Sequence, residues 1–547
     1  MRKLKAALSL LALSALVLTL TACGKSAESN SNDKKQVLNL SATAPLDTID
    51  ISKASGYGQT GNVFESFYRL GKNGKVSPGL AKSSSVSKDG KTWTFKLRNA
   101  KWSNGDKITA RDFVYSWRRT LTPKTKSTYA YLFSGIQNAD DISAGKKAPS
   151  SVGISAPDSK TVVIKLDKPI AYFKVLMAYP LFGPQNQKVV EKYGKKYATK
   201  SQYMVYSGPF KIKKWNGTGN KWQFVKNNQY WDKKVVKLRE INYLVVESPT
   251  TGQELYQQGK LDLTPLAGQQ VKNFKHSSQF KQYPYSYVSY LQYNFKDSDP
   301  VKRAAFNNQN IRLALSLAID RDVLIQKILG NGSQTPKGFV ASDLASDPQT
   351  GKDFADQQFV KNTVKRDTKL AKQHWTQGLK EIGQKKLDLS LLASNDDSNG
   401  SVIAQYLQST YAKVLPGLNI KVNSIPGKNA QQNALQGNFD IFLSGWGGDF
   451  NDPITFLQIP ESNTAYNYGK YSSAKYDELI RRAQNDDAND QHKRWSDLVQ
   501  AARLLNSEQG MTPVYQQVTA YLQKNDIKGI IHNTAGAQWN YKYAYKK

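Results

Sequence analysis

The 547-residue chain has almost no cysteine, and this scarcity excludes several kinds of site. Cys23 is the only one, so a disulfide, an iron–sulfur cluster or a cysteine-ligated zinc cannot form within one chain. The four histidines stand singly, without the spacing of metal ligands. The sequence also has no G-x-S-x-G motif, which would position a hydrolase serine. We therefore expect no metal, no other cofactor and no enzymatic activity.

Long apolar runs are equally scarce, and the clearest one lies at the beginning of the chain. Residues 6–20 are almost entirely apolar and follow three cations, Arg2, Lys3 and Lys5. This run is shorter than the roughly 20 residues that cross a bilayer as a helix. It is typical of an export signal, which we assign to residues 1–22.

The apolar run is followed directly by Cys23, within the sequence LTACG at residues 20–24. Small residues before a cysteine resemble the processing site of bacterial lipoproteins. The resemblance implies cleavage before Cys23 and a diacylglycerol on its sulfur, and two acyl chains hold a protein stably where one is marginal. The polar residues 23–36 would then form a flexible tether. An ordinary secretory signal with an incidental cysteine is the alternative.

The charge of the chain is strongly positive. The formal net charge is +34, lysine far outnumbers arginine, and the cations are spread along the whole chain. Nucleic-acid binding favours a clustered basic face with arginine at the base edges. We therefore expect no nucleic-acid partner. A solvated basic surface suits a protein that lies beside an anionic membrane or wall.

Strand and helix patterns are mixed throughout the rest of the chain. Thr109 is expected to cap a helix that begins at residue 110, and Asn310 one over 311–329. Because no repeat is visible, the predicted fold class is mixed α/β in more than one lobe. Further expected elements are strands at 37–43, 92–97, 162–166, 241–246 and 440–446, and a helix at 494–507.

Several longer segments resemble one family of exported proteins. The longest, residues 79–119, matches that family's signature almost element by element. Other matching segments follow in the family's order at 127–130, 140–147, 206–211, 228–231, 259–262, 311–321 and 445–457. From about residue 37 to 547 the chain resembles the peptide-binding proteins of ABC importers, in particular the oligopeptide-binding group of solute-binding family 5.

This resemblance implies a bilobed clam-shell of the periplasmic-binding-protein type (type II), with an extra inserted subdomain. The second lobe would be reached through two crossover strands. The implied boundaries are 37–64, 188–286 and 518–547 for a discontinuous lobe I, 65–187 for the inserted subdomain and 287–517 for lobe II.

The resemblance also implies a function. The chain would be a monomeric receptor, anchored through Cys23 to membrane lipid on the outer face of the bacterial cell membrane. It would capture oligopeptides between its lobes and deliver them to ABC permease subunits that work with cytoplasmic ATPases. Two alternatives stay open: a receptor of the same fold for a signalling peptide or another small ligand, and a surface peptidase or adhesin.

Asp449 is the residue expected to receive the amino group of a bound peptide. It lies just past the strand 440–446, and open α/β sheets bind ligands at the carboxyl ends of their strands. A buried ammonium needs a carboxylate partner. By resemblance, the acid of the family's Trp-x-x-Asp pattern has this role, and Trp446 to Asp449 fits the pattern. A turn or capping aspartate, like Asp452, is the alternative.

Other contacts to a peptide are expected to use the main chain, which all peptides share. By resemblance, Ser55, Gly56 and Tyr57 form a strand edge on lobe I. Gly445 and Trp446 would offer main chain from the opposite lobe.

Two more residues are singled out by the resemblance. The hydroxyl of Tyr129 would reach the peptide near its N-terminus, although simple packing is equally compatible with the sequence. Gln517 would contribute through its main chain. Tyr287 and Tyr290 fall at the first crossover, and either core or contact fits them.

Family members that bind the peptide's C-terminal carboxylate use cations at positions that correspond to Leu443, Ala434 and Asn399 here. None of the three is cationic. The preferred peptide length therefore stays open.

Overall fold

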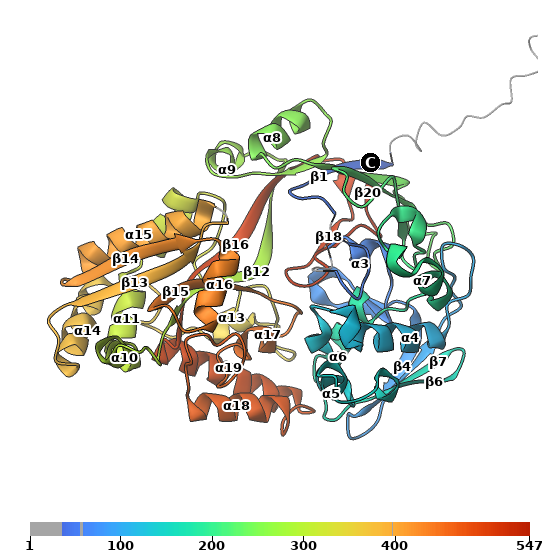
Figure 1. Ribbon diagram of the computed structural model, residues 1–547. Coiled ribbons are helices and arrows are strands. Elements are labelled where there is room, and N and C mark those ends of the chain that lie inside the picture. The colour runs from blue at the N-terminus through green and yellow to red at the C-terminus, as the bar shows by residue number, and fades with distance from the viewer. Residues whose placement is uncertain (1–35, 47, 55–57, 397) are drawn as a thin grey trace, which may run out of the picture.

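The computed structural model describes residues 36–46, 48–54, 58–396 and 398–547. It consists of two lobes joined by two long antiparallel strands, β12 (Phe280–Tyr293) and β16 (Met511–Gln523) (Figure 1). Each of these strands is long enough to run from one lobe into the other, at about 3.3 Å per residue. In the described ranges, no helix is both long and apolar enough to cross a membrane.

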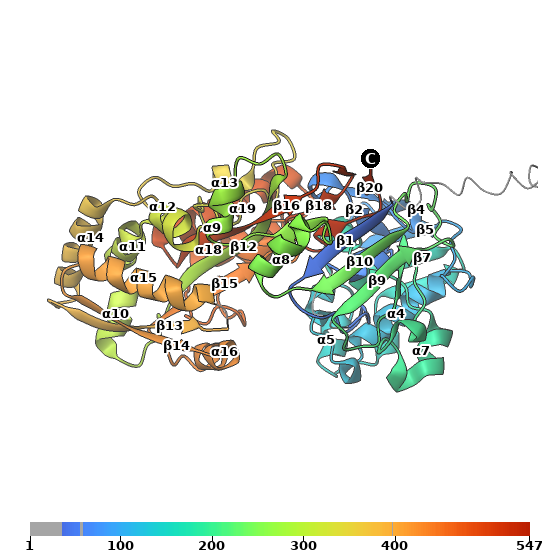
Figure 2. The same ribbon diagram turned by 90° about the horizontal axis from the view of Figure 1, so that it is seen from above.

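One ten-stranded sheet extends through both lobes, as the view from above shows (Figure 2). β12 and β16 are adjacent near its middle, with the strands of one lobe on each side. On the lobe II side the order continues outward through β15 (Ile441–Gly447), β13 (Leu387–Ser394) and β14 (Leu418–Ile425). On the lobe I side it continues through β11 (Leu263–Pro265), β1 (Val37–Ala42), β10 (Glu240–Val245), β9 (Lys221–Lys226) and β8 (Phe210–Lys213).

The lobe I strands alternate as their sequence predicts. In β1, Leu38 and Leu40 are buried and their neighbours are more exposed. They pack in one hydrophobic cluster with Phe224 and Ile241 from the neighbouring strands β9 and β10. The strands predicted at 37–43 and 241–246 are therefore confirmed to within one residue.

Residues 65–187 contain a separate four-stranded sheet in the order β4-β5-β7-β6, with bounds Ala81–Val86, Thr92–Leu97, Thr161–Lys165 and Ile154–Asp158. Helix α4 (Ala110–Leu121) is capped by Thr109, which forms a capping box with Asp112, as the sequence predicts. The predicted helix face, Phe113 and Trp117, is fully buried. The ring of Phe113 stacks on that of Phe67 at 4.2 Å.

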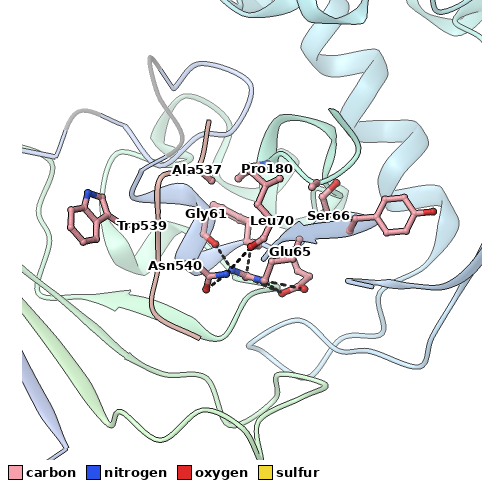
Figure 3. A pocket seen from close by; sticks show the side chains of 12 residues that line it. Gly61, Glu65, Ser66, Leu70, Pro180, Ala537, Trp539 and Asn540 are labelled. Atoms are coloured by element: carbon pink, nitrogen blue, oxygen red, sulfur yellow. Dashed lines mark hydrogen bonds and ion pairs between the residues drawn. The ribbon is translucent and has the colours of Figure 1, made fainter. Parts of the chain in front are cut away.

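A buried ion pair lies where this segment leaves lobe I (Figure 3). Arg69 Nη2 is 3.0 Å from Glu65 Oε2, and Arg69 Nη1 donates to the carbonyl of Gly61 at 2.9 Å. Tyr230 donates its hydroxyl to the same Glu65 oxygen at 2.7 Å. The adjoining cavity has a volume of only about 10 Å³, which suits one water molecule, and so this junction is structural.

Lobe II packs helices on its part of the sheet, and one of them corrects a prediction. The helix predicted over 311–329 begins earlier and is interrupted: α11 (Gln309–Ala318) is capped by Asn308, not by Asn310. The chain leaves the helical conformation at Ile319, and the Asp320 side chain caps the next short helix, α12 (Arg321–Val323). Other helices here are α14 (Thr368–Glu381), α15 (Ser398–Val414), α18 (Ala474–Gln484) and α19 (Gln491–Glu508).

The fold is therefore mixed α/β and bilobed, as predicted. The domain boundaries of lobe I, the inserted subdomain and lobe II stay predictions.

Candidate functional site

A cavity of about 580 Å³ lies between the two lobes. One side comes from lobe II, through the end of β15 and the loop after it. The opposite side comes from the inserted subdomain and from the segment near the C-terminus. The lining residues are Gly58, Thr128, Tyr129, Tyr131, Tyr285, Tyr287, Trp446, Gly447, Gly448, Asp449, Tyr466, Gly536 and Gln538.

The carboxyl end of β15 forms the lobe II side of this cavity. β15 pairs with β12 along its whole length, whereas its ladder with β13 ends at Phe442. The main chain of residues 445–447 therefore has one edge that extends past the ladder with β13.

Gly445 is required by its neighbour on β12. A Cβ atom at residue 445 would lie 1.8 Å from the hydroxyl oxygen of Tyr287, so any side chain would displace that ring. A Cβ atom at Gly447 would lie 2.8 Å from the hydroxyl of Tyr285. The two glycines thus let two tyrosine rings lie directly on the strand, at the wall of the cavity.

Asp449 is held in position by hydrogen bonds from its own N–H and from the N–H of the residue before it. Its N–H donates to Thr455 Oγ1 at 3.0 Å, and the preceding N–H of Gly448 donates to the Ser286 carbonyl at 2.6 Å. Its carboxylate accepts one hydrogen bond from the opposite wall, from Tyr131 Oη to Oδ2 at 2.9 Å. Burial raises the pKa of Asp449 to about 6, although the Tyr131 hydrogen bond opposes this shift. A buried carboxylate with a neutral donor favours a positively charged ligand.

Aromatic rings surround this carboxylate. Three pairs line the cavity: Tyr129 with Tyr131 and Tyr285 with Tyr287, each at 6.0 Å between ring centroids, and Trp446 with Tyr466 at 4.8 Å. Burial and the nearby charge of Asp449 raise the pKa of Tyr129 to about 12, so its hydroxyl stays neutral. Neutral aromatic faces attract cations, which adds to the attraction by the carboxylate.

The structure brings together three of the residues predicted from the sequence. Tyr129, Trp446 and Asp449 all line the cavity, while Gly445 lies beneath the ring of Tyr287 beside it. Gln517 is half-buried in β16 and is not among the lining residues.

Four predicted residues lie outside the described residues: Ser55, Gly56, Tyr57 and Cys23. Gly58, the first described residue after the segment 55–57, does line the cavity.

Several cavity residues were not predicted. Tyr131, Tyr466 and Gln538 come from three distant segments, and none has a local signal of its own. Of the two crossover tyrosines, Tyr287 lines the cavity and Tyr290 is buried in the core.

The cavity lining, as far as the chain is described, contains no lysine or arginine. At the positions where the family was expected to have cations, Leu443 and Ala434 are buried in the structure, and Asn399 is exposed on α15. The described residues contain no cluster of histidine, cysteine or acidic side chains suited to hold a metal ion.

Comparisons with known proteins agree with this architecture. Residues 75–468 match the family "Bacterial extracellular solute-binding proteins, family 5 Middle". The dipeptide-binding protein of Lactococcus lactis subsp. cremoris is 38% identical, and the match covers 98% of each chain. The oligopeptide-binding protein OppA of Bacillus subtilis is 31% identical over 88% of this chain and 87% of its own.

A solved structure has the same fold over nearly its whole length. Listeria monocytogenes OppA bound to peptide superposes with a TM-score of 0.76 at 37% identity, covering 94% of this chain and 99% of its own. The match to residues 75–468 and the near-complete coverage by relatives above 30% identity lead to one conclusion. The chain belongs to the bacterial extracellular solute-binding proteins of family 5.

Proposed function

We propose that this protein is the substrate-binding receptor of an ABC importer and captures oligopeptides in the cavity between its lobes. The carboxylate of Asp449 receives the peptide's α-ammonium. The observation that carries the proposal is a carboxylate buried at the lobe interface whose side-chain donor is a neutral hydroxyl, at 2.9 Å, rather than a cation of the protein.

The surrounding aromatic rings support a cationic ligand. They exclude water from the carboxylate, which strengthens its attraction for an ammonium. Their faces also favour positive charge. A peptide carries its α-ammonium at one end only, so this arrangement fixes the direction in which a peptide binds.

Main-chain hydrogen bonds hold the rest of the peptide. The edge of residues 445–447 beyond the β13 ladder offers alternating donors and acceptors to an extended chain. Such contacts do not depend on peptide side chains, as a receptor for many sequences requires. The peptide-binding relatives named above support this choice of ligand. Ser55, Gly56 and Tyr57 would complete the clamp from lobe I, Tyr129 would contact the peptide near its N-terminus, and Gln517 would add its main chain.

The mechanism follows from the two crossover strands. β12 and β16 connect the lobes, and their pairing is irregular between Pro284 and Val288. Bending there would open and close the cavity, and a peptide that contacts both lobes favours the closed form. The permease would then recognise the closed protein, lipid-anchored at Cys23 on the outer face of the membrane.

The experiment is calorimetric titration of a free-amine pentapeptide and the same peptide with an acetylated N-terminus. We expect the free-amine peptide to bind at one per chain and to be recovered intact, and the acetylated peptide to bind at least 100-fold more weakly, in line with about 3 kcal/mol for an unpaired buried charge. Equal binding of the two peptides would disprove the role of Asp449. Shortened peptides would favour a peptidase.

A further inference from the structure

The net charge of the molecule is divided very unevenly between its two halves. Lobe II (287–517) contains 26 lysines and arginines against 24 acidic residues, a net charge of +2. The lobe I segments (37–64, 188–286 and 518–547) contain 24 against 9, a net charge of +15. The inserted subdomain (65–187) contains 21 against 8, a net charge of +13. Cations occur along the whole chain, but the acids are concentrated in lobe II.

Within lobe I, a group of cations lies on the segments next to Gln36, the first residue that the structure describes. We call this group the tether-side surface. It comprises six exposed cations: Lys233, Lys234, Lys237, Arg239, Lys528 and Lys547.

Two of these cations, Arg239 and Lys237, contact Gln36 or the C-terminal residues beside it. The Arg239 N–H donates to the Gln36 carbonyl at 2.9 Å, and the Gln36 side chain bonds both the carbonyl and the N–H of Lys546 at 2.8 and 3.2 Å. Lys237 Nζ lies 4.1 Å from the ring centroid of Tyr545. β1, β20 (Tyr545–Lys546) and the C-terminus accordingly lie at one edge of lobe I (Figure 1).

Two of the acids nearby, Asp232 and Asp262, are neutralised within the protein, and two others, Glu240 and Asp526, are half-buried. Asp232 forms an ion pair with buried Lys542 at 2.8 Å. Asp262 is paired with Lys546 at 2.8 Å and with Lys524 at 3.6 Å. The charge that the tether-side surface presents to solvent is therefore predominantly positive.

An aromatic side chain accompanies the cations. Tyr543 is 40% exposed and follows Lys542, whose Nζ lies 5.1 Å from its ring centroid. Tyrosine suits a membrane interface, because its ring is apolar and its hydroxyl is polar.

We propose that the tether-side surface binds the anionic phospholipid headgroups of the membrane. Lobe I then rests on the bilayer, and nearly neutral lobe II stays free to move. The proposal relies on the proposed lipid anchor at Cys23. The thirteen residues 24–36 span at most about 45 Å and about 20 Å as a coil, so the anchor keeps the tether-side surface close to the headgroups. Anionic lipid attracts clustered lysines and arginines over about a Debye length.

The test uses the full lipidated chain inserted into vesicles of phosphatidylcholine, with or without phosphatidylglycerol. Lysines are acetylated chemically, and the rate of acetylation of each lysine is measured by mass spectrometry. With phosphatidylglycerol we expect Lys237 and Lys528 to react at least about threefold more slowly, and to recover at 0.5 M salt. Three exposed lysines of lobe II should keep their rates in both vesicles: Lys369, Lys372 and Lys385.

Charge-reversal variants sharpen this test. K233E/K234E/K237E should abolish the protection of Lys528, whereas the matched lobe II variant K369E/K372E/K385E should leave it intact. Equal rates on both vesicles would overturn the proposal. Protection that appears only when soluble poly(glycerol phosphate) is added would assign this surface to a wall polymer and would also overturn it.

Failure of the anchor is distinguishable from failure of the surface contact. An unmodified mass for the Cys23 peptide, with loss of the chain from both vesicles, would contradict the anchor and with it this proposal. Peptide binding is measured separately, and neither charge-reversal variant should change it.

Discussion

Two carboxylates three residues apart, Asp449 and Asp452, follow the same strand but meet opposite surroundings. Asp452 accepts two hydrogen bonds from Arg494, at 2.7 and 2.9 Å, and a third from the Ile454 N–H at 3.0 Å. Arg494 is itself only 6% exposed. Asp449 faces the cavity, and among the described residues the hydroxyl of Tyr131 donates to its carboxylate.

The difference separates a structural acid from a binding acid. Asp452 is neutralised by a cation of the protein, and the same arginine lies 5.9 Å from the ring centroid of Tyr172, which stacks on Phe450. This cluster joins lobe II to the inserted subdomain. Asp449 has a neutral partner in the same region, so its negative charge is available to a ligand. Local pattern alone gives both residues the same description, an aspartate in a turn after a strand, and only the Trp-x-x-Asp resemblance separates Asp449 from Asp452.

The largest effect is expected from Asp449→Asn, which removes the charge and keeps the shape. Without the charge, the α-ammonium of a bound peptide has no ionic partner, which costs about 3–5 kcal/mol. Affinity for a free-amine peptide should therefore fall roughly 100- to 3,000-fold by calorimetry. The urea midpoint of unfolding should not fall, because the substitution also removes a buried charge. Unchanged affinity would make Asp449 a structural residue like Asp452.

Asp452→Ala should give the opposite result. It leaves Arg494 buried without its carboxylate, so the free energy of unfolding should fall by about 3–5 kcal/mol in urea titrations. Peptide affinity of the folded fraction should fall less than in Asp449→Asn. Asp452→Leu combined with Arg494→Met provides the control, because replacing both charges by apolar groups should recover much of the lost stability. A fall of stability below about 1 kcal/mol in Asp452→Ala would contradict the structural role.

A smaller effect, about tenfold, is expected from pH. Because burial raises the pKa of Asp449 to about 6, the carboxylate of the free protein becomes protonated between pH 7 and pH 5. A peptide amine needs the ionised form, so affinity should be about tenfold weaker at pH 5 than at pH 7. Asp449→Asn should remove this dependence, and a flat wild-type profile would contradict it.

The ionisation of Asp449 affects stability and binding in opposite directions as the pH rises: peptide affinity increases, whereas the stability of the free protein decreases. The folded-state pKa of Asp449 lies above its ordinary value of 3.8, so the folded protein binds more protons in this range. The contribution of Asp449 to stability is therefore present below about pH 4 and is lost as the pH rises through 6.

The parts of the fold with strong local signals could be predicted from the sequence. The strand Thr92–Leu97 alternates clearly, and the capping box of Thr109 with Asp112 fixes the start of α4. The helix at 311–329 could not be predicted correctly, because its break depends on tertiary contacts. Arg321, only 2% exposed, donates to the Pro513 carbonyl of β16, which lies almost 200 residues away.

The candidate site, like the fold, could be predicted from the sequence only in part. Asp449 and Trp446 were predicted because they lie in one short motif. The tyrosines that surround the carboxylate come from separate segments. Tyr131 follows the predicted Tyr129 by two residues but was not singled out, and nothing near Tyr466 in the sequence indicates a shared cavity. Long-range convergence of this kind depends on how the lobes and the inserted subdomain pack together, which no local pattern encodes.

The smallest effect is expected from Tyr131→Phe, which removes the neutral hydroxyl that donates to Asp449. The lost hydroxyl donates to Asp449 Oδ2 and stabilises its ionised form, so the pKa of Asp449 should rise further. The midpoint of the affinity–pH profile should move up by less than about one unit, since one hydrogen bond contributes about 1 kcal/mol. Tyr285→Phe alters another hydroxyl of the same wall and should leave the midpoint nearly unchanged. An unmoved midpoint in Tyr131→Phe, or equal shifts in both variants, would mean that Tyr131 packs beside Asp449 without controlling its charge.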